Sequence, residues 1–162
     1  FTSLRISLAY IKSFSFYLKI PVVPINSFQI LALALNKSIT SSPLIIAIDA
    51  RMNEIYWTYC ENSSKVFFKN IKYNLTSEIE MCEKIENLFL DNLVLIKNDK
   101  SIFKSRDNNT LFANINTIDS CKSHLKEIFS FIEKSFNRNS VKNSDGINLL
   151  YIRDNVAKKK YE

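Results

Sequence analysis

The sequence predicts an α/β fold with a mixed β-sheet, on three observations. Apolar residues recur at helical spacing over residues 4–18. After residue 43, three apolar or aromatic runs follow one another with short turns between them, which is typical of an antiparallel meander. A helical pattern, a strand pattern and a second helical pattern come next. Together with the meander, they give the element order of an α/β fold.

Before residue 43 the sequence predicts two helices and one short strand. The apolar repeat indicates a helix over residues 2–18, which ends before a proline. Residues 22–25 are expected to form a short strand with a proline near its edge or end. Ser27 has the side chain of an N-cap and would begin a second helix over residues 28–35. The polar residues 36–42 break the pattern, and we place a lobe boundary there.

The predicted sheet begins with a continuous apolar strand over residues 44–50, whose composition indicates burial on both faces. Met52 and Asn53 are expected to make a tight turn, after which an aromatic-rich strand returns over residues 54–61. A third strand is expected over residues 65–73. Together these three strands form the meander.

Two helices and two strands complete the predicted order. Ser77 opens a capping box that starts a helix over residues 78–89, and residues 93–96 are expected to be another buried strand. The cleanest helical periodicity lies at residues 118–136, and residues 149–152 would be a final strand. The order strand-strand-strand-helix-strand-helix after residue 43 is that of a ribonuclease-H-like lobe.

The length and composition suit one domain or two small lobes with a core, since 46% of the 162 residues are hydrophobic and 23% are charged. The longest apolar runs, such as residues 43–48, are far shorter than the ~20 residues that span a bilayer, so we predict no membrane contact. Cys60, Cys82 and Cys121 are far apart and form no Cys-x-x-Cys pattern. They indicate reduced residues of a cytoplasmic protein.

The chain is basic, with a formal net charge of +6 and a pI of about 9.2. Two explanations stay open. An AT-rich coding sequence favours Lys over Arg whatever the function, and this chain is rich in Lys, Asn and Ile. Alternatively, the charge helps a complex to approach RNA. We favour the first explanation because the positive charges are scattered, apart from those of residues 158–160.

The single glycine, Gly146, bears on how the chain makes its turns and on what it binds. Tight turns often need a positive φ, which Asn and Asp tolerate better than other non-glycine residues. We expect Asn53 and the pairs 98–99 and 108–109 to take that role. A lone glycine also argues against a phosphate-binding loop, so the sequence predicts no nucleotide cofactor.

The first helix carries more apolar surface than a helix that lies on one core. Its apolar residues occupy roughly 200° of the circumference, against about 100° for an ordinary amphipathic helix. Arg5 and Lys12 share the remainder. Such a helix is either buried between layers of its own domain or docks on another protein, and the sequence leaves both open. The apolar residues are Leu4, Ile6, Leu8, Tyr10, Ile11, Phe14, Tyr17 and Leu18.

Four blocks of the sequence resemble, in order, the signature blocks of one family. Residues 1–9 resemble Phe-Thr-Gly-Leu-Arg-Ile-Gly, and residues 20–28 resemble an Ile-Pro-Val strand followed by Ser-Ser-Leu. Residues 48–57 resemble Asp-Ala-Arg-Met-Gly-Glu-Val-Tyr, and residues 151–157 resemble Tyr-Leu-Arg-Asn-Asn-Val-Ala. The family that these blocks resemble is TsaB, also called YeaZ.

The resemblance implies the actin-like ATPase superfold, with two ribonuclease-H-like lobes, and a non-catalytic role in making threonylcarbamoyladenosine next to the anticodon of tRNA. In that family the subunit binds and activates TsaD, the threonylcarbamoyltransferase, and the helix that matches residues 2–18 helps to form a helix bundle with it. The resemblance further implies a TsaE-like ATPase in the assembled complex, indirect contact with tRNA, and a homodimer when TsaD is absent.

The chain departs from the family in two ways. Ser3, Ser7 and Asn53 stand where the family has glycine, and the first two add small polar side chains that would loosen close packing of the first helix. The family also has a sheet, a helix and a Gly-Pro-Gly-Ser stretch before the position of Phe1, so we expect an incomplete first lobe, through a partial sequence or gene decay. The predicted parts are residues 1–40 as the remnant of the first ribonuclease-H-like lobe, 41–145 as the second lobe, and 146–162 as a C-terminal strand and basic tail.

The candidate functional residues form two groups, and we predict no catalytic, metal or cofactor site. The single histidine, His124, cannot supply a pair of metal ligands, and no Ser or Cys has a matched base. The candidates for partner binding lie on the first helix: Leu4, Arg5, Leu8, Tyr10, Ile11, Phe14 and Tyr17. The candidates for a lobe or interface network flank the buried strand and the chain end: Asp49, Arg51, Glu54, Arg153 and Asn155.

Plainer interpretations of these residues stay open. Asp49 and Arg51 would then only satisfy backbone groups at the strand end, Arg5 would solvate the polar side of its helix, and Arg153 would lie in a solvated tail. The functional prediction is a TsaB-like accessory subunit. Its rivals are a stand-alone actin-like ATPase or glycoprotease-like peptidase, and a decayed, non-functional remnant.

Overall fold

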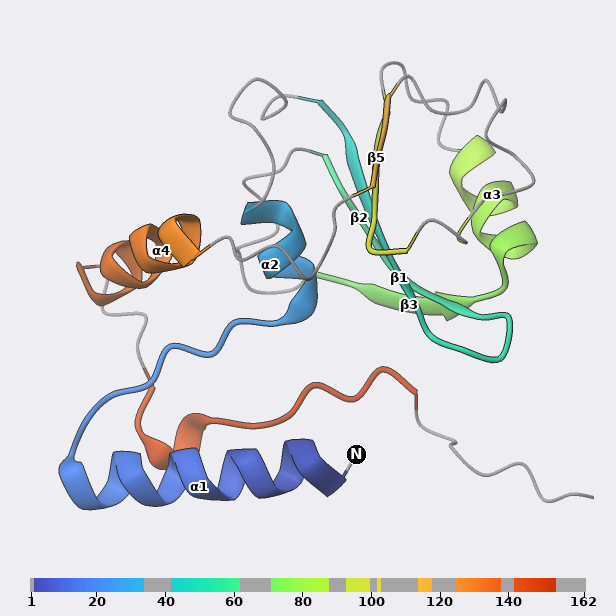
Figure 1. The fold of residues 1–162 in the computed structure, drawn as a ribbon. Helices are drawn as coiled ribbons and strands as arrows, with labels where there is room; N and C mark the ends of the chain where they lie inside the picture. Colours follow the sequence, from blue (N-terminus) through green and yellow to red (C-terminus); the bar gives the residue numbers. More distant parts are fainter. Residues whose placement is uncertain are drawn as a thin grey trace, which may run out of the picture. The chain divides into compact units, whose positions relative to one another are not determined.

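The computed structural model describes residues 2–33, 42–61, 71–87, 93–99, 102, 114–117, 125–137 and 142–153. The chain divides into two compact units that alternate along the sequence (Figure 1). Phe1–Asn26 and His124–Tyr151 form one, which we call the helical unit. Ser27–Ser123 and Ile152–Glu162 form the other, which we call the sheet unit. The lobe boundaries predicted after residues 40 and 145 stay a prediction.

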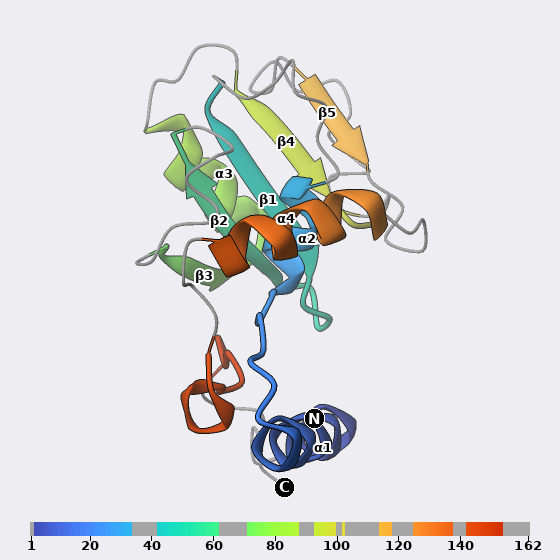
Figure 2. The same ribbon diagram turned by 90° about the vertical axis from the view of Figure 1, so that its left-hand side faces the viewer.

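Within the described residues, the sheet unit is built on a five-stranded mixed sheet with the order β3-β2-β1-β4-β5. The central strand β1 (Leu44–Asp49) pairs antiparallel with β2 (Ile55–Cys60) and parallel with β4 (Val94–Lys97). β3 (Tyr73–Thr76) lies antiparallel to β2, and β5 (Asn114–Thr117) lies parallel to β4. Figure 2 shows the strands side by side in this order. The predicted α/β fold with a mixed sheet is confirmed.

Both faces of this sheet are covered, which explains why β1 and β4 are continuous apolar runs. Helix α3 (Glu78–Glu86) lies on one face and helix α2 (Ser27–Leu33) on the other (Figure 1). Successive strand residues point to opposite faces, so each strand contributes to two clusters. The cluster under α3 contains Ile45, Ala47, Ile55, Trp57, Met81, Cys82, Ile85, Leu93, Leu95 and Ile102. The cluster under α2 contains Phe28, Leu31, Ala32, Leu44, Ile46, Cys60, Val94 and Ile96.

The hairpin that joins β1 to β2 contains three consecutive non-glycine residues with positive φ. Arg51, Met52 and Asn53 have φ values of 64°, 58° and 57°. The left-handed conformation costs an ordinary L-residue roughly 1–2 kcal/mol, although Asn tolerates it better. Two backbone hydrogen bonds close the turn: the Ala50 N–H donates to the Glu54 carbonyl at 3.0 Å, and the Glu54 N–H donates to the Arg51 carbonyl at 3.1 Å. The tight turn predicted here is confirmed, and its strained backbone extends beyond Asn53.

Within the described residues, the helical unit contains two α-helices and one 3-10 helix. Its elements are α1 (Thr2–Leu18), α4 (Leu125–Asn137) and the 3-10 helix η4 (Ser144–Gly146). η4 contacts α1. Val22 and Lys142 form an isolated antiparallel bridge, with N–H···O distances of 2.9 Å in both directions. The bridge fixes the segment that contains η4 to the chain that leaves α1.

The predicted helix over residues 2–18, the strands over 44–50, 54–61 and 93–96, and the Ser77 cap are confirmed to within a few residues. The Ser77 hydroxyl accepts a hydrogen bond from the Glu80 N–H at 3.3 Å. These elements follow from local pattern, so the sequence was sufficient to place them.

Two predicted strands are wrong. Of residues 22–25, only Val22 pairs, in the bridge to Lys142. Residues 149–152, predicted as the C-terminal strand, form no strand either. β5 was not predicted, and the strand expected over residues 65–73 lies largely outside the described residues, with β3 beginning at Tyr73. A strand forms only where it pairs with another strand, and the residue pattern of one segment does not show which segment it pairs with.

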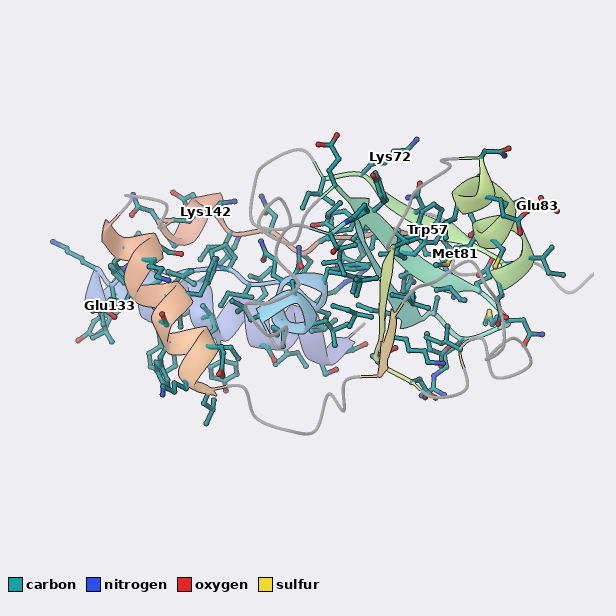
Figure 3. The ribbon with its side chains drawn as sticks, turned by 90° about the horizontal axis from the view of Figure 1, so that it is seen from above. Trp57, Lys72, Met81, Glu83, Glu133 and Lys142 are labelled. Carbon is teal, nitrogen blue, oxygen red and sulfur yellow. The ribbon has the colours of Figure 1, made fainter. Side chains whose placement is uncertain are left out.

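The buried hydrogen bond between Trp57 and Thr76 gives a first prediction. The Trp57 Nε1–H donates to Thr76 Oγ1 at 2.9 Å within the core under α3, where Figure 3 shows Trp57 and Met81. Thr76→Val keeps the shape but leaves a buried donor unpaired, so the free energy of unfolding should fall by about 1–3 kcal/mol in urea denaturation. Thr76→Ser, which keeps the hydroxyl, is the control. A loss for Thr76→Val no larger than for Thr76→Ser would contradict the assignment.

The positive φ of Met52 gives a second prediction. Met52→Gly should be more stable than Met52→Ala by about 1 kcal/mol, because glycine adopts φ of 58° without steric cost. Both substitutions remove the same exposed side chain, so their difference reports the backbone alone. Urea denaturation of the pair measures it. Equal stabilities of the two variants would show that the turn is not strained at this position.

Candidate functional site

α1 turns its polar side toward the rest of the helical unit. Ser15 is buried, and Leu8 and Lys12 are half-buried. With Arg5 they follow one line along the helix at spacings of three and four residues. The Ser15 hydroxyl donates to the Ile20 carbonyl at 2.7 Å, so the covered side ends in a satisfied polar contact. We call this line of residues the covered side of α1.

The opposite side of α1 is apolar and exposed. We call it the apolar arc, and it spans about 160° of the helix at 100° per residue. Its members are Leu4, Ile6, Tyr10, Ile11, Phe14, Tyr17 and Leu18, which are 46% to 82% exposed. Arg5 and Lys12, the charged residues of α1, both belong to the covered side. A helix normally buries its apolar side, so the exposed arc is a candidate binding surface.

Arg5 is held within the helical unit by Tyr151. The Arg5 Nε–H donates to the Tyr151 phenol oxygen at 3.2 Å, and the guanidinium carbon lies 5.9 Å from the centre of the Tyr151 ring. Hydrogen bonding and the cation–π contact act on the same pair. Arg5 therefore anchors the segment that ends at Tyr151.

The sequence-predicted partner-binding residues divide between the two sides of α1. Those on the arc are Leu4, Tyr10, Ile11, Phe14 and Tyr17. Leu8 is half-buried on the covered side, and Arg5 contacts Tyr151 rather than projecting from the arc. Ile6 and Leu18 are exposed on the arc but were not among the candidates, although their helical spacing was a sufficient signal.

A second group of functional candidates meets at the β1–β2 hairpin. Arg153 is only 12% exposed, and its guanidinium forms an ion pair with Glu54, with 2.5 Å between Nη2 and Oε2. Nη2 also donates to the Ala50 carbonyl at 3.1 Å, and Nη1 lies 3.8 Å from the Met52 sulfur. The guanidinium carbon lies 5.8 Å from the centre of the Tyr56 ring. The structure thus brings together residues that are about a hundred positions apart.

Asp49 and Arg51 interact with each other and with the turn rather than with Arg153. The Arg51 N–H donates to Asp49 Oδ1 at 2.8 Å, and the two side chains form an ion pair at 3.7 Å in which Arg51 is almost fully exposed. The Asp49 N–H donates to the side chain of Asn98 at 3.0 Å, which ties the ends of β1 and β4 together. An exposed ion pair of this kind contributes little stability. Asn155, the last candidate, lies outside the described residues.

Sequence reasoning missed Tyr56, Ala50 and Tyr151 as contacts of the two arginines. The sequence did hold a signal for these contacts, because Tyr56 and Ala50 lie in the same matched block as Glu54, and Tyr151 lies in the same matched block as Arg153.

Within the described part of the chain, no group of three or more His, Cys, Asp or Glu side chains lies close enough to hold a metal. His124 and Cys121 lie outside that part. In the same part, none of the helices combines the length and apolar content that crossing a bilayer requires.

Comparison with known proteins finds one family model and several relatives that this chain resembles. A family model described as TsaD, tRNA N6-adenosine threonylcarbamoyltransferase, matches residues 1–117. The tRNA threonylcarbamoyladenosine biosynthesis protein TsaB of Buchnera aphidicola subsp. Acyrthosiphon pisum (strain APS) is 32% identical over 89 residues, which are 54% of this chain and 40% of that protein. TsaB of Buchnera aphidicola subsp. Schizaphis graminum (strain Sg) is 32% identical over 65 residues, which are 40% of this chain and 31% of that protein. The chain spans less than half the length of these relatives.

Two solved structures from Pseudomonas aeruginosa share the fold. One is an uncharacterized protein with similarity to peptidase YeaZ, with a TM-score of 0.63 and 18% identity over 94% of this chain and 68% of that one. The other is YeaZ, with a TM-score of 0.61 and 18% identity over 93% of this chain and 69% of that one. The predicted actin-like fold is confirmed.

Proposed function

This chain belongs to the TsaD family, within which its relatives are TsaB (YeaZ) proteins, and on that premise we propose that it is a non-catalytic subunit of tRNA threonylcarbamoyladenosine biosynthesis. It binds a TsaD-like catalytic paralogue through the apolar arc of α1 and holds that enzyme in an active arrangement. A TsaE-like ATPase and tRNA join through the same assembly in the cytoplasm, and the arc pairs two copies of the chain when the paralogue is absent.

One observation carries the proposal: the arc is wide, exposed and free of charge. Its seven apolar residues cover about 160° of α1 and leave both charged residues on the covered side. Removing that much apolar surface from water on binding is favourable at roughly 25 cal/mol per Å². A partner with a complementary apolar surface is therefore the ligand that the arc fits best.

Two serines indicate that the partner surface is itself a helix. Ser3 and Ser7 lie within the arc, one helical turn apart, between the larger side chains of Tyr10 and Leu4. Small residues in a helix face leave a groove into which the ridge of a second helix can pack. The proposed interface is accordingly a helix packed against α1 along the line of these serines.

A pair of phenylalanines on α1 tests the arc. Phe14 and Phe16 are both exposed, at 58% and 77%, but Phe14 lies on the arc and Phe16 on the other side of the helix. Phe14→Asp should weaken binding of the TsaD-like paralogue from the same source by about a hundredfold, because a buried charge without a partner costs several kcal/mol. Phe16→Asp should change the dissociation constant by less than about threefold.

Isothermal titration calorimetry measures both variants, and circular dichroism checks that α1 stays helical. Equal losses for the two variants would show that the docking surface is not the arc. Turnover of ATP or of a peptide by the purified chain alone would overturn the non-catalytic role.

The absence of charge on the arc makes a separate prediction about salt. Raising the ionic strength from about 0.05 M to about 0.5 M should change the dissociation constant by less than about threefold, because screening acts on charged contacts and not on apolar burial. Calorimetry over a salt series measures it. A weakening of tenfold or more would show that charged residues outside the arc dominate the interface.

A further inference from the structure

The turn of the β1–β2 hairpin adopts a conformation that its own residues do not favour. Arg51, Met52 and Asn53 have positive φ, which is unfavourable for residues with a side chain and least so for Asn. The side chains of Arg51 and Met52 are mostly exposed, so they bury little surface that would compensate. Backbone strain of this kind persists only where surrounding contacts hold it. The contacts at the two ends of the turn therefore decide whether this conformation is kept.

Arg153 reaches both ends of the turn with one nitrogen atom. Its Nη2 lies 2.5 Å from Glu54 Oε2 and donates to the Ala50 carbonyl at 3.1 Å. The Ala50 N–H and the Glu54 carbonyl are themselves joined by the backbone hydrogen bond of 3.0 Å that closes the turn. The guanidinium therefore bridges the residue that follows β1 and the residue that precedes β2.

Arg153 is held in place by the core of the sheet unit. Ile152, the preceding residue, packs against the hydrophobic cluster under α2, and so does Tyr56. The Tyr56 ring centre lies 5.8 Å from the guanidinium carbon, and only 12% of the Arg153 side chain is exposed. The guanidinium is thus anchored by residues outside the turn that it contacts.

We propose that Arg153 is a clamp that holds the β1–β2 turn in its left-handed conformation. With the clamp in place, the exposed side chains of Arg51 and Met52 keep a fixed direction. Without it, the turn relaxes to negative φ and loses its closing hydrogen bonds. Arg153 acts through the ends of the turn, so it is a positioning residue. The clamp lies within the sheet unit and does not depend on the docking role proposed for α1.

The charge of Glu54 keeps the clamp closed. Arg153 Nε is buried and forms no hydrogen bond within the described residues, so the Glu54 carboxylate compensates a largely buried cation. The other described contacts of the guanidinium are a carbonyl, a sulfur and an aromatic ring. A buried cation that loses its carboxylate is strongly unfavourable. The ion pair therefore keeps the guanidinium at the position from which it also reaches the Ala50 carbonyl.

The difference in stability between glycine and alanine at position 52 tests the clamp. Glycine is favoured over alanine only while residue 52 keeps a positive φ, so this difference reports the conformation of the turn. In the original chain, Met52→Gly should have an unfolding equilibrium constant about fivefold lower than that of Met52→Ala. With Arg153→Met added to both variants, the difference should fall below about twofold or reverse, because the unclamped turn leaves the left-handed region.

Urea denaturation of the full chain, followed by tryptophan fluorescence, measures these equilibrium constants. Trp57 is the single tryptophan of the chain and lies in the core under α3, so the signal reports unfolding of the sheet unit. An undiminished difference between the glycine and alanine variants in the Arg153→Met background would overturn the clamp. The turn would then keep its conformation without Arg153.

Arg51→Met is the matched control, since it removes the other arginine of the hairpin, whose ion pair with Asp49 is exposed. It should leave the difference at position 52 unchanged, and an equal loss in this background would overturn the assignment to Arg153. Arg153→Lys keeps the charge but loses the planar fork, so it should reduce the difference to an intermediate value. If Arg153→Met fails to fold, Arg153→Lys carries the test, and an undiminished difference there would likewise overturn the clamp.

Discussion

The apolar arc of α1 is the constraint from which the functional interpretation follows. A helix of 17 residues has a limited circumference, and here the side facing its own unit is occupied by Arg5, Leu8, Lys12 and Ser15. The larger apolar side chains therefore remain in water, where they are unfavourable by roughly 25 cal/mol for each Å² that a partner would cover. Because the arc holds no charge, neither desolvation of ions nor unpaired charges would oppose its burial.

The sheet unit has a well-packed core of its own. Its central strands β1 and β4 bury apolar side chains on both faces, under α2 and α3, so they have little freedom to shift. The β1–β2 hairpin extends from this core with three left-handed residues in its turn. Strain of that kind persists only where surrounding contacts hold it, and the closing hydrogen bonds and Arg153 supply those contacts.

Two matched sequence blocks meet at this hairpin, and a third lies on α1. Glu54 and Tyr56 come from the block over residues 48–57, and Arg153 and Tyr151 from the block over residues 151–157. Arg153 contacts the hairpin while Tyr151, two residues earlier, contacts Arg5 of the first block. The two contacts lie only two residues apart on the chain. The arginine in each contact meets an aromatic ring, which gives a structural reason for charged and aromatic residues to occur together in these blocks.

The sequence by itself determined the elements whose causes are local: the helix over residues 2–18, the buried runs of β1 and β4, the turn at Met52 and the Ser77 cap. It also indicated that α1 has excess apolar surface, and it placed Glu54 and Arg153 among the candidates. Only the tertiary structure decided which side of α1 is covered, that Glu54 and Arg153 form a pair, and that residues 22–25 and 149–152 are not strands. The physical reason is that strand pairing, burial and ion pairing depend on contacts between distant parts of the chain, whereas periodicity and capping depend on neighbours within a few residues.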